Sequence, residues 1–279
     1  MSELTLIERH KMFNGHQERY RHASKTNNCE MTFSIYLPPM ALQGYKVPVL
    51  YWLSGITATD ENFTLKAGAQ RFAAQWGMAL VMADTSPRGE GVADRDELGV
   101  GLGAGFYVNA TEMPWAKHYQ MYDYIVHELP ELVESHFPVT DKRSIAGHSM
   151  GGHGALMIAL KNPGRYASVS AFAPIANPSE TPLWQKALTA YLGEDRSAWL
   201  PYDSTELVKN ATQTLPIWVD QGDSDEYYQE LRPEAFINAA RGKGFNVQFS
   251  MRKGYDHSYF FVGSFIDAHI EFHADALGL

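Results

Sequence analysis

Residues 143–152 read Arg143-Ser144-Ile145-Ala146-Gly147-His148-Ser149-Met150-Gly151-Gly152. The residues up to Ala146 predict a short buried strand, and residues 152–160, rich in Ala, Leu, Met and Ile, predict a helix. Between them stands Gly-x-Ser-x-Gly, the pattern of a tight strand-to-helix turn whose small flanking residues leave a serine hydroxyl exposed. Ser149 is therefore the predicted nucleophile. A glycine-rich packing turn without chemistry remains the alternative.

Apolar runs and helical periodicities alternate along the rest of the chain. Strands are predicted over 31–37, 47–53, 78–83, 168–173, 215–221 and 245–251, and helices over 63–75, 121–137 (interrupted near Pro130), 233–242 and 260–276. This alternation predicts a mostly parallel sheet with helices on both faces. The order matches an α/β-hydrolase fold in a single domain over 1–279. Residues 174–214 are too long for a plain connection, and we expect them to form a partial cap.

Composition narrows the class of protein. The chain has 279 residues and a formal net charge of −9, which argues against nucleic acid or an anionic membrane as partner. A single cysteine, Cys29, leaves no internal disulfide framework or multi-cysteine zinc site, so a cytoplasmic setting is expected. No cofactor or metal is predicted. His269 and His273 lie one helical turn apart but without an accompanying carboxylate or cysteine cluster, and we expect a solvated helix face.

A serine nucleophile needs a base and an acid that orients the base. In this fold the acid follows the serine and the histidine comes last. His257 follows the last predicted strand and is the expected base, although it could simply cap the terminal helix. Asp220, Asp223 and Asp225 all lie at the end of the preceding strand. Spacing alone does not choose, and we favour Asp225 because it lies deepest in the loop.

Two backbone amides and one arginine complete the candidate set. The oxyanion hole is expected to use the amide of Met150 and one from the loop 54–57, with Ile56 favoured and Gly55 as the alternative. The stretch 84–89 is rich in turn-forming residues, and we expect an ordered loop in which Arg88 pairs with an acid near the carboxyl edge of the sheet. Recognition of a substrate carboxylate by Arg88 is the second interpretation.

The sequence resembles the S-formylglutathione hydrolases, also called the esterase D family, over nearly its whole length. The blocks that carry the resemblance are 53–55 (Leu-Ser-Gly), 84–89 (Asp-Thr-Ser-Pro-Arg-Gly), 103–107 (Gly-Ala-Gly-Phe-Tyr), 147–154 (Gly-His-Ser-Met-Gly-Gly-His-Gly), 170–175 (Ser-Ala-Phe-Ala-Pro-Ile) and 254–259 (Gly-Tyr-Asp-His-Ser-Tyr). The resemblance implies hydrolysis of the thioester S-formylglutathione to glutathione and formate, without a metal or organic cofactor. It also implies that Asp225, the second aspartate of the family's Asp-Gln-Gly-x-x-Asp block, is the catalytic acid, and that the protein forms a homodimer or a higher homo-oligomer.

Two departures from the family pattern lie near the expected pocket. Relatives commonly have Thr-Cys where this chain has Thr57-Ala58, and Pro-Trp-Gly where it has Pro182-Leu183-Trp184. The active-site thiol is therefore missing and the tryptophan is displaced by one residue. We expect Trp184 to contact substrate and to restrict acyl length. A broad short-chain carboxylesterase stays open as an alternative, and a non-catalytic binding protein on a hydrolase fold is a remote one.

Overall fold

The computed structural model describes residues 3–279, and these contain one nine-stranded sheet of order β1-β2-β3-β5-β4-β6-β7-β8-β9. The strands are β1 (Thr5–Met12), β2 (Gly15–Ser24), β3 (Cys29–Leu37), β4 (Val47–Leu53), β5 (Ala79–Ala83), β6 (Val139–His148), β7 (Val169–Phe172), β8 (Ile217–Gly222) and β9 (Val247–Arg252). Strands β5, β4 and β6 to β9 pair in parallel, whereas β1, β2, β3 and β5 pair antiparallel. The predicted fold class, a mostly parallel sheet of the α/β-hydrolase type, is confirmed.

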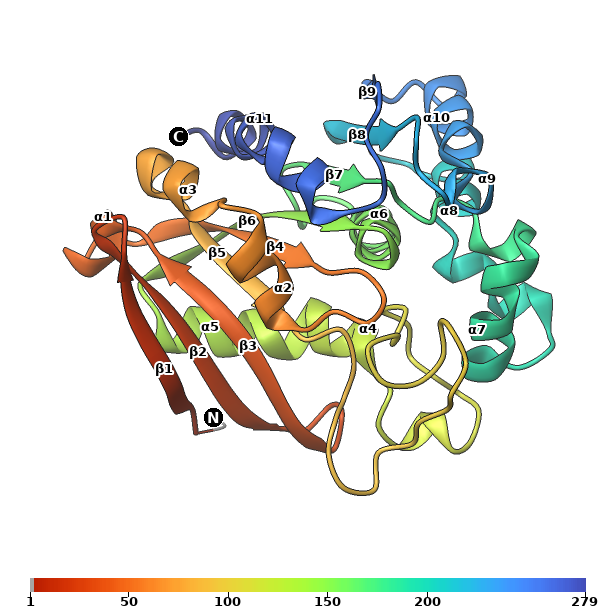
Figure 1. The fold of residues 1–279 in the computed structure, drawn as a ribbon, viewed down its shortest axis with the longest axis horizontal. Helices are drawn as coiled ribbons and strands as arrows, with labels where there is room; N and C mark the ends of the chain where they lie inside the picture. Colours follow the sequence, from red (N-terminus) through yellow and green to blue (C-terminus); the bar gives the residue numbers. More distant parts are fainter. Residues whose placement is uncertain (1–2) are drawn as a thin grey trace.

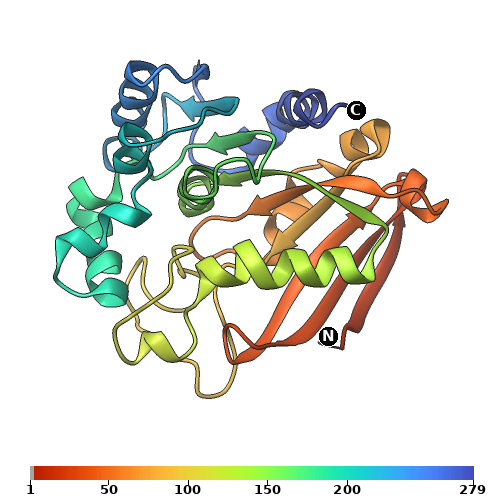
Figure 2. The ribbon, with the colours of Figure 1, turned by 180° about the vertical axis from the view of Figure 1, so that it is seen from behind.

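Helices cover both faces of this sheet. They are α1 (Pro39–Leu42), α2 (Asp60–Lys66), α3 (Gln70–Trp76), η1 (Trp115–Lys117), α4 (Met121–Asp123), η2 (Tyr124–Glu128), α5 (Leu129–His136), α6 (Met150–Lys161), η3 (Pro178–Glu180), α7 (Pro182–Leu192), η4 (Arg196–Ala198), η5 (Leu200–Tyr202), α8 (Ser204–Lys209), α9 (Tyr228–Leu231), α10 (Pro233–Gly242) and α11 (Tyr259–Leu277). Helices α2, α3 and α11 cover the face turned to the viewer in Figure 1. Helix α5 crosses the opposite face, in front in Figure 2. Buried strands such as β4 and β5 are apolar throughout because both faces are covered.

Two predicted helices differ from the observed ones. The helix expected over 63–75 is two helices, because the chain turns at Gly68 with φ +68° between α2 and α3. In the stretch 121–137, Pro130 lies in the first turn of α5 and does not end the helix. The turn before it, η2, is a π-helix. This wider turn lets a residue without a backbone N–H follow without breaking the helix.

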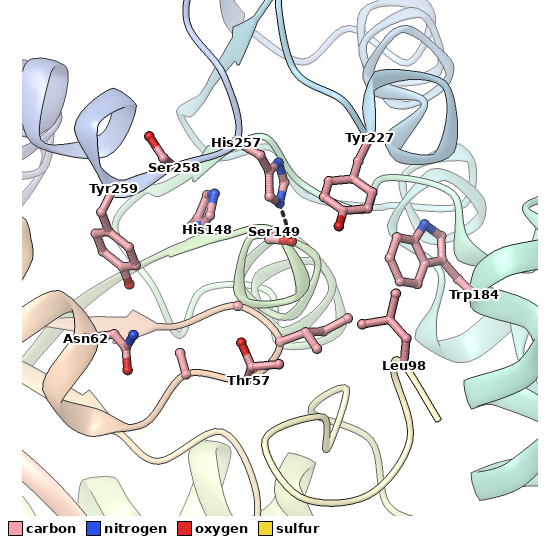
Figure 3. A pocket seen from close by; sticks show the side chains of 13 residues that line it. Thr57, Asn62, Leu98, His148, Ser149, Trp184, Tyr227, His257, Ser258 and Tyr259 are labelled. Atoms are coloured by element: carbon pink, nitrogen blue, oxygen red, sulfur yellow. Dashed lines mark hydrogen bonds between the residues drawn. The ribbon is translucent and has the colours of Figure 1, made fainter. Parts of the chain in front are cut away.

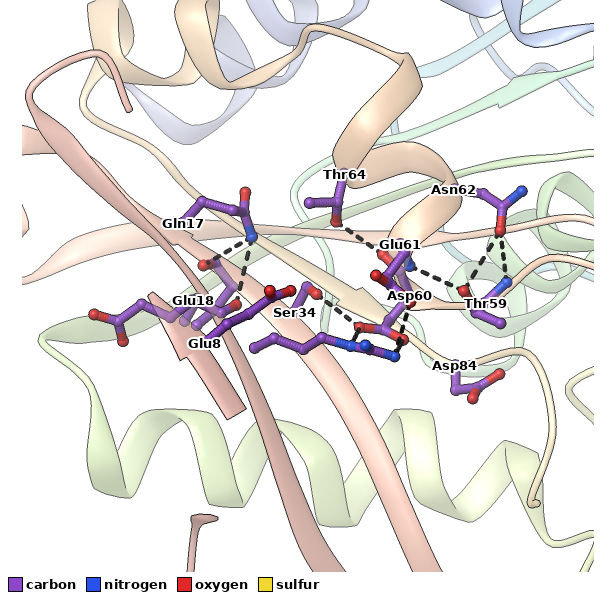
Figure 4. A network of polar contacts seen from close by, with 12 residues as sticks. Glu8, Gln17, Glu18, Ser34, Thr59, Asp60, Glu61, Asn62, Thr64 and Asp84 are labelled. Carbon is purple, nitrogen blue, oxygen red and sulfur yellow. Dashed lines mark hydrogen bonds and ion pairs between the residues drawn. The ribbon is translucent and has the colours of Figure 1, made fainter. Parts of the chain in front are cut away.

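Strands β1 and β2 are absent from the sequence prediction. Strand β1 is exposed along almost its whole length, so its side chains do not divide into a buried and an exposed set. Strand β2 buries polar residues through ion pairs: Arg19 Nε lies 2.8 Å from Asp60 Oδ2, and Arg9 Nε lies 2.6 Å from Glu18 Oε1. Figure 4 shows the part of this network around Asp60, to which Ser34 also donates a hydrogen bond. The partners that permit burial come from distant segments, and local hydrophobicity does not reveal them.

The segment 174–214, predicted as a partial cap, contains η3, α7, η4, η5 and α8. It lies beside the carboxyl ends of β7 and β8 in Figure 1, where α7 stands at the edge of the molecule. Within residues 3–279, no helix is both long and apolar enough to cross a membrane.

Candidate active site

Ser149 stands at the turn between β6 and α6 with φ +58° and ψ −121°. A left-handed φ is uncommon for a residue with a side chain, and it places the hydroxyl on the outside of the turn. The flanking glycines are required by space: a Cβ on Gly147 would overlap the Gly151 carbonyl, and one on Gly151 would overlap the Leu53 carbonyl. The Ser149 amide donates to Phe172 O at 2.9 Å, which ties the turn to β7. The predicted strand-turn-helix context of Ser149 is confirmed.

The serine hydroxyl is linked to a histidine and an aspartate from other loops at the same edge of the sheet. His257 Nε2 lies 2.8 Å from Ser149 Oγ, and His257 Nδ1 lies 2.7 Å from Asp225 Oδ2. Figure 3 shows the imidazole pointing at the serine from the loop that follows β9. Asp225 comes from the loop after β8. Because carboxyl ends of parallel strands meet at one edge, residues far apart in sequence converge here.

Neighbouring groups fix the histidine and the aspartate. Asp225 Oδ2 also accepts a bond from Gln221 Nε2 at 3.0 Å, and Oδ1 accepts one from the Tyr227 amide at 2.8 Å. The His257 ring lies between His148 and Tyr227, with ring centroids 4.7 and 5.1 Å away. Gln221 and Tyr227 were not predicted as site residues. Both residues lie within four positions of Asp225 in the sequence, and this proximity is the feature from which they could have been predicted.

The two other aspartates of this segment have different partners. Asp220 Oδ2 lies 2.7 Å from Arg252 Nε, and its Oδ1 accepts a bond from Trp218 Nε1 at 2.7 Å. Exposed Asp223 accepts a bond from the Gly254 amide at 2.7 Å. Asp220 therefore stabilises the packing of β8 against β9, and Asp223 stabilises the adjoining turn. Of the three carboxylates, Asp225 is the one bonded to His257.

Backbone amides near Ser149 fit an oxyanion hole. Met150 is the first residue of α6, where an amide has no partner within the helix. In the loop after β4, the Thr57 amide donates to Gly103 O at 2.9 Å and the Ala58 amide to Gly55 O at 3.3 Å. Within residues 3–279, the amides of Gly55 and Ile56 donate to no protein group. The Ile56 amide is therefore consistent with its predicted role as an oxyanion donor, and Gly55 stays the alternative donor.

The hydroxyl of Ser149 opens into a cavity of about 300 Å³. Its lining residues are Gly55, Ile56, Thr57, Ala58, Asn62, Leu98, His148, Ser149, Trp184, Tyr227, His257, Ser258 and Tyr259. Trp184 and Leu98 face each other on one side of the cavity in Figure 3. The Trp184 indole donates to Glu230 O at 2.8 Å, which fixes its orientation. Leu98 was not predicted, since nothing in its local sequence distinguishes it from other loop residues.

Arg88 and Cys29 lie outside this cavity. They line a separate hollow together with Asp84. Arg88 Nε lies 2.8 Å from Asp84 Oδ2, so the predicted pairing with an acid is confirmed. The guanidinium is also bonded to Ala58 O, and the recognition of a substrate carboxylate by Arg88 stays a prediction. Burial raises the pKa of the Cys29 thiol to about 11.

The prediction of a solvated face for His269 and His273 is wrong, because both side chains are buried. His269 stacks between Phe172 and Trp218. His273 lies 2.7 Å from Ser168 Oγ and 2.8 Å from Ser170 Oγ. Hydroxyl and aromatic partners from neighbouring strands make burial possible, and they are not visible in the helix sequence. Within residues 3–279, no cluster of three His, Cys, Asp or Glu side chains is arranged to hold a metal ion.

The sheet order, the strained serine turn and the hydrogen-bonded serine are those of a serine hydrolase with an α/β-hydrolase fold. The chain belongs to the esterase family whose model is described as "Putative esterase", which matches residues 24–272.

Solved structures agree with this assignment. An S-formylglutathione hydrolase from Agrobacterium tumefaciens is 44% identical, with a TM-score of 0.94, over 98% of this chain and 100% of that one. A fluorophosphonate-binding serine hydrolase from Staphylococcus aureus is 19% identical, with a TM-score of 0.75, over 93% and 98% of the two chains. A ferulic acid esterase is 20% identical, with a TM-score of 0.71, over 100% and 99%. The last two share the fold.

Proposed function

We propose that this enzyme hydrolyses S-formylglutathione to glutathione and formate, with Ser149, His257 and Asp225 as its catalytic triad. The observation that carries the proposal is the continuous chain of hydrogen bonds from Asp225 through His257 to Ser149, at the floor of a small cavity. The similarity to the Agrobacterium tumefaciens S-formylglutathione hydrolase supports the choice of substrate.

The reaction follows from these contacts. Ser149 Oγ attacks the formyl carbonyl while His257 Nε2 takes the hydroxyl proton. The amides of Met150 and Ile56 stabilise the negative charge on the carbonyl oxygen. The C–S bond then breaks, and the imidazolium of His257 protonates the leaving thiolate. Water, deprotonated by His257, attacks the formyl ester, which releases formate and restores the serine. Asp225 holds the imidazole in the required tautomer and stabilises its cation.

The cavity favours a short acyl group. Trp184 and Leu98 lie on one side of it, and its volume of about 300 Å³ is at the small end for ligand sites. We propose that Trp184 restricts acyl length and that residues 174–214 act as a partial cap on a single catalytic domain. We also propose a small-molecule substrate, a cytoplasmic location consistent with the single cysteine, and a homodimer or higher homo-oligomer, which the resemblance suggests.

A broad short-chain carboxylesterase is the second candidate. The specific observation in its favour is that Ala58, the position where relatives carry a cysteine, lines the cavity, together with apolar side chains of Ile56, Leu98 and Trp184. An apolar pocket without that thiol would accept the acyl group of a simple ester as well as that of a thioester.

Steady-state kinetics separate the two candidates. We expect kcat/KM for S-formylglutathione to exceed that for p-nitrophenyl acetate by about 10² or more, since binding of the peptide part adds to transition-state stabilisation. The Ser149→Ala variant should retain neither activity. Comparable values for the two substrates would favour the carboxylesterase. Equal activity of wild type and Ser149→Ala would refute the serine mechanism.

A further inference from the structure

The loop between β4 and α2 contains a strained residue next to the proposed oxyanion donor. Thr57 has φ +69°, a left-handed conformation that is a clear outlier for a β-branched side chain. Such residues persist only where the surroundings fix them. Thr57 directly follows Ile56, so the conformation of this turn sets the direction of the Ile56 amide.

Neighbouring loops hold this turn from two sides. The Thr57 amide donates to Gly103 O at 2.9 Å, and a Cβ on Gly103 would come within 2.9 Å of Thr57 Cα. On the other side, the carbonyl oxygen of Ala58 accepts two bonds. One comes from Arg88 Nη2 at 3.1 Å and the other from the Thr85 hydroxyl. The turn is therefore fixed on both sides of Thr57.

Arg88 is itself anchored. Its Nε lies 2.8 and 3.1 Å from the two Asp84 oxygens, and Asp84 Oδ1 also accepts a bond from the Thr85 amide at 2.7 Å. Asp84 is buried, with 7% of its side chain exposed. The planar guanidinium thus joins a fixed carboxylate to the carbonyl of the oxyanion loop. A lysine ammonium lacks this rigid fork.

We propose that Arg88 is a positioning residue, which holds the Ala58 carbonyl and so keeps the strained Thr57 turn in the conformation that aims the Ile56 amide at the oxyanion. The proposal rests on the serine-hydrolase mechanism proposed above but not on the identity of the thioester. It assigns to Arg88 a role in the rate of acyl transfer for any substrate, in place of the recognition of a substrate carboxylate.

The test uses Arg88→Lys and Thr85→Val, because both change donors to the Ala58 carbonyl. Exposed Arg71→Gln is the matched control. Each variant is assayed with p-nitrophenyl acetate, which has no carboxylate, and with S-formylglutathione, and its thermal midpoint is recorded. We expect kcat of Arg88→Lys to fall about 10- to 10²-fold on both substrates, up to the range seen when one oxyanion donor is lost. KM should change less than about threefold.

Guanidinium rescue distinguishes positioning from a general loss of structure. In Arg88→Ala, millimolar guanidinium should restore part of kcat with KM unchanged, because the free cation can occupy the vacated position. A loss confined to S-formylglutathione and expressed in KM would overturn the proposal in favour of carboxylate recognition. Wild-type kcat in both Arg88→Lys and Thr85→Val would also overturn it. If wild-type enzyme cleaves only the ester, the proposed substrate fails while Arg88 is still tested on the ester.

Discussion

At the scale of single residues, the serine was the most predictable member of the site. Its turn requires glycine on both sides for steric reasons, and both glycines fall within five consecutive residues, Gly147 to Gly151. His257 could be predicted because the order of the triad along the chain leaves one suitable loop. The aspartate could not be chosen from spacing, since three carboxylates follow the same strand. The family resemblance implied Asp225, and in the structure Asp220 and Asp223 differ from it by their partners, Arg252 and Gly254.

The contrast between two of these aspartates gives a prediction. Asp225→Asn should lower kcat by about 10⁴, because an amide at this position favours the wrong tautomer of His257. Asp223→Asn should change kcat by less than about threefold, since Asp223 is exposed and bonded to the Gly254 amide. Steady-state kinetics of both variants on the same ester provide the measurement. A severe loss of kcat in Asp223→Asn with a mild one in Asp225→Asn would identify Asp223 as the catalytic acid in place of Asp225.

At the scale of secondary-structure elements, the buried strands and the terminal helices were predicted well. Strands β4 and β5 and helix α10 have strong local patterns, and their observed bounds fall within one residue of those expected. The failures have two causes. Strand β1 is exposed along almost its whole length and so shows no burial pattern, whereas the ion-paired strand β2 and the two histidines of α11 depend on partners distant in sequence. Hydrophobic periodicity predicts a buried face only where the buried residues are apolar.

The packing of α6 against β4 yields a prediction at this scale. Gly151→Ala should abolish soluble expression or reduce activity below detection, because its methyl group would overlap the carbonyl of Leu53. Gly263→Ala in α11 is the control: the added Cβ would lie 3.6 Å from its nearest neighbour, an ordinary contact. That substitution should leave activity intact and stabilise the protein by up to about 1 kcal/mol through helix propensity. Urea unfolding and esterase activity report both effects, and a fully active Gly151→Ala enzyme would contradict the steric argument.

At the scale of the whole molecule, the fold buries histidines on both sides of the sheet. Burial lowers the pKa of His22 in β2, of His148 and His153 around the serine turn, and of His269 and His273 in α11. For His153 the lowered pKa is about 4. The folded protein therefore keeps these imidazoles neutral, while the unfolded chain protonates them near pH 6.5. The contribution of these neutral histidines to stability is therefore fully present above the unfolded pKa of about 6.5 and declines as the pH falls toward the lowered values.

Urea unfolding between pH 7.5 and 5.0 tests this expectation. At pH 5 the shift of His153 alone, to a pKa of about 4, should cost about 2 kcal/mol of unfolding free energy, because the unfolded state binds the proton and the folded state does not. Carboxylates with ordinary pKa values near 4 remain mostly charged in this window. In His153→Gln the decline between pH 7.5 and 5.0 should therefore be smaller than in wild type by about this amount, whereas exposed His10→Gln should keep the wild-type slope. An unchanged slope in His153→Gln would show that the acid sensitivity of the molecule arises elsewhere.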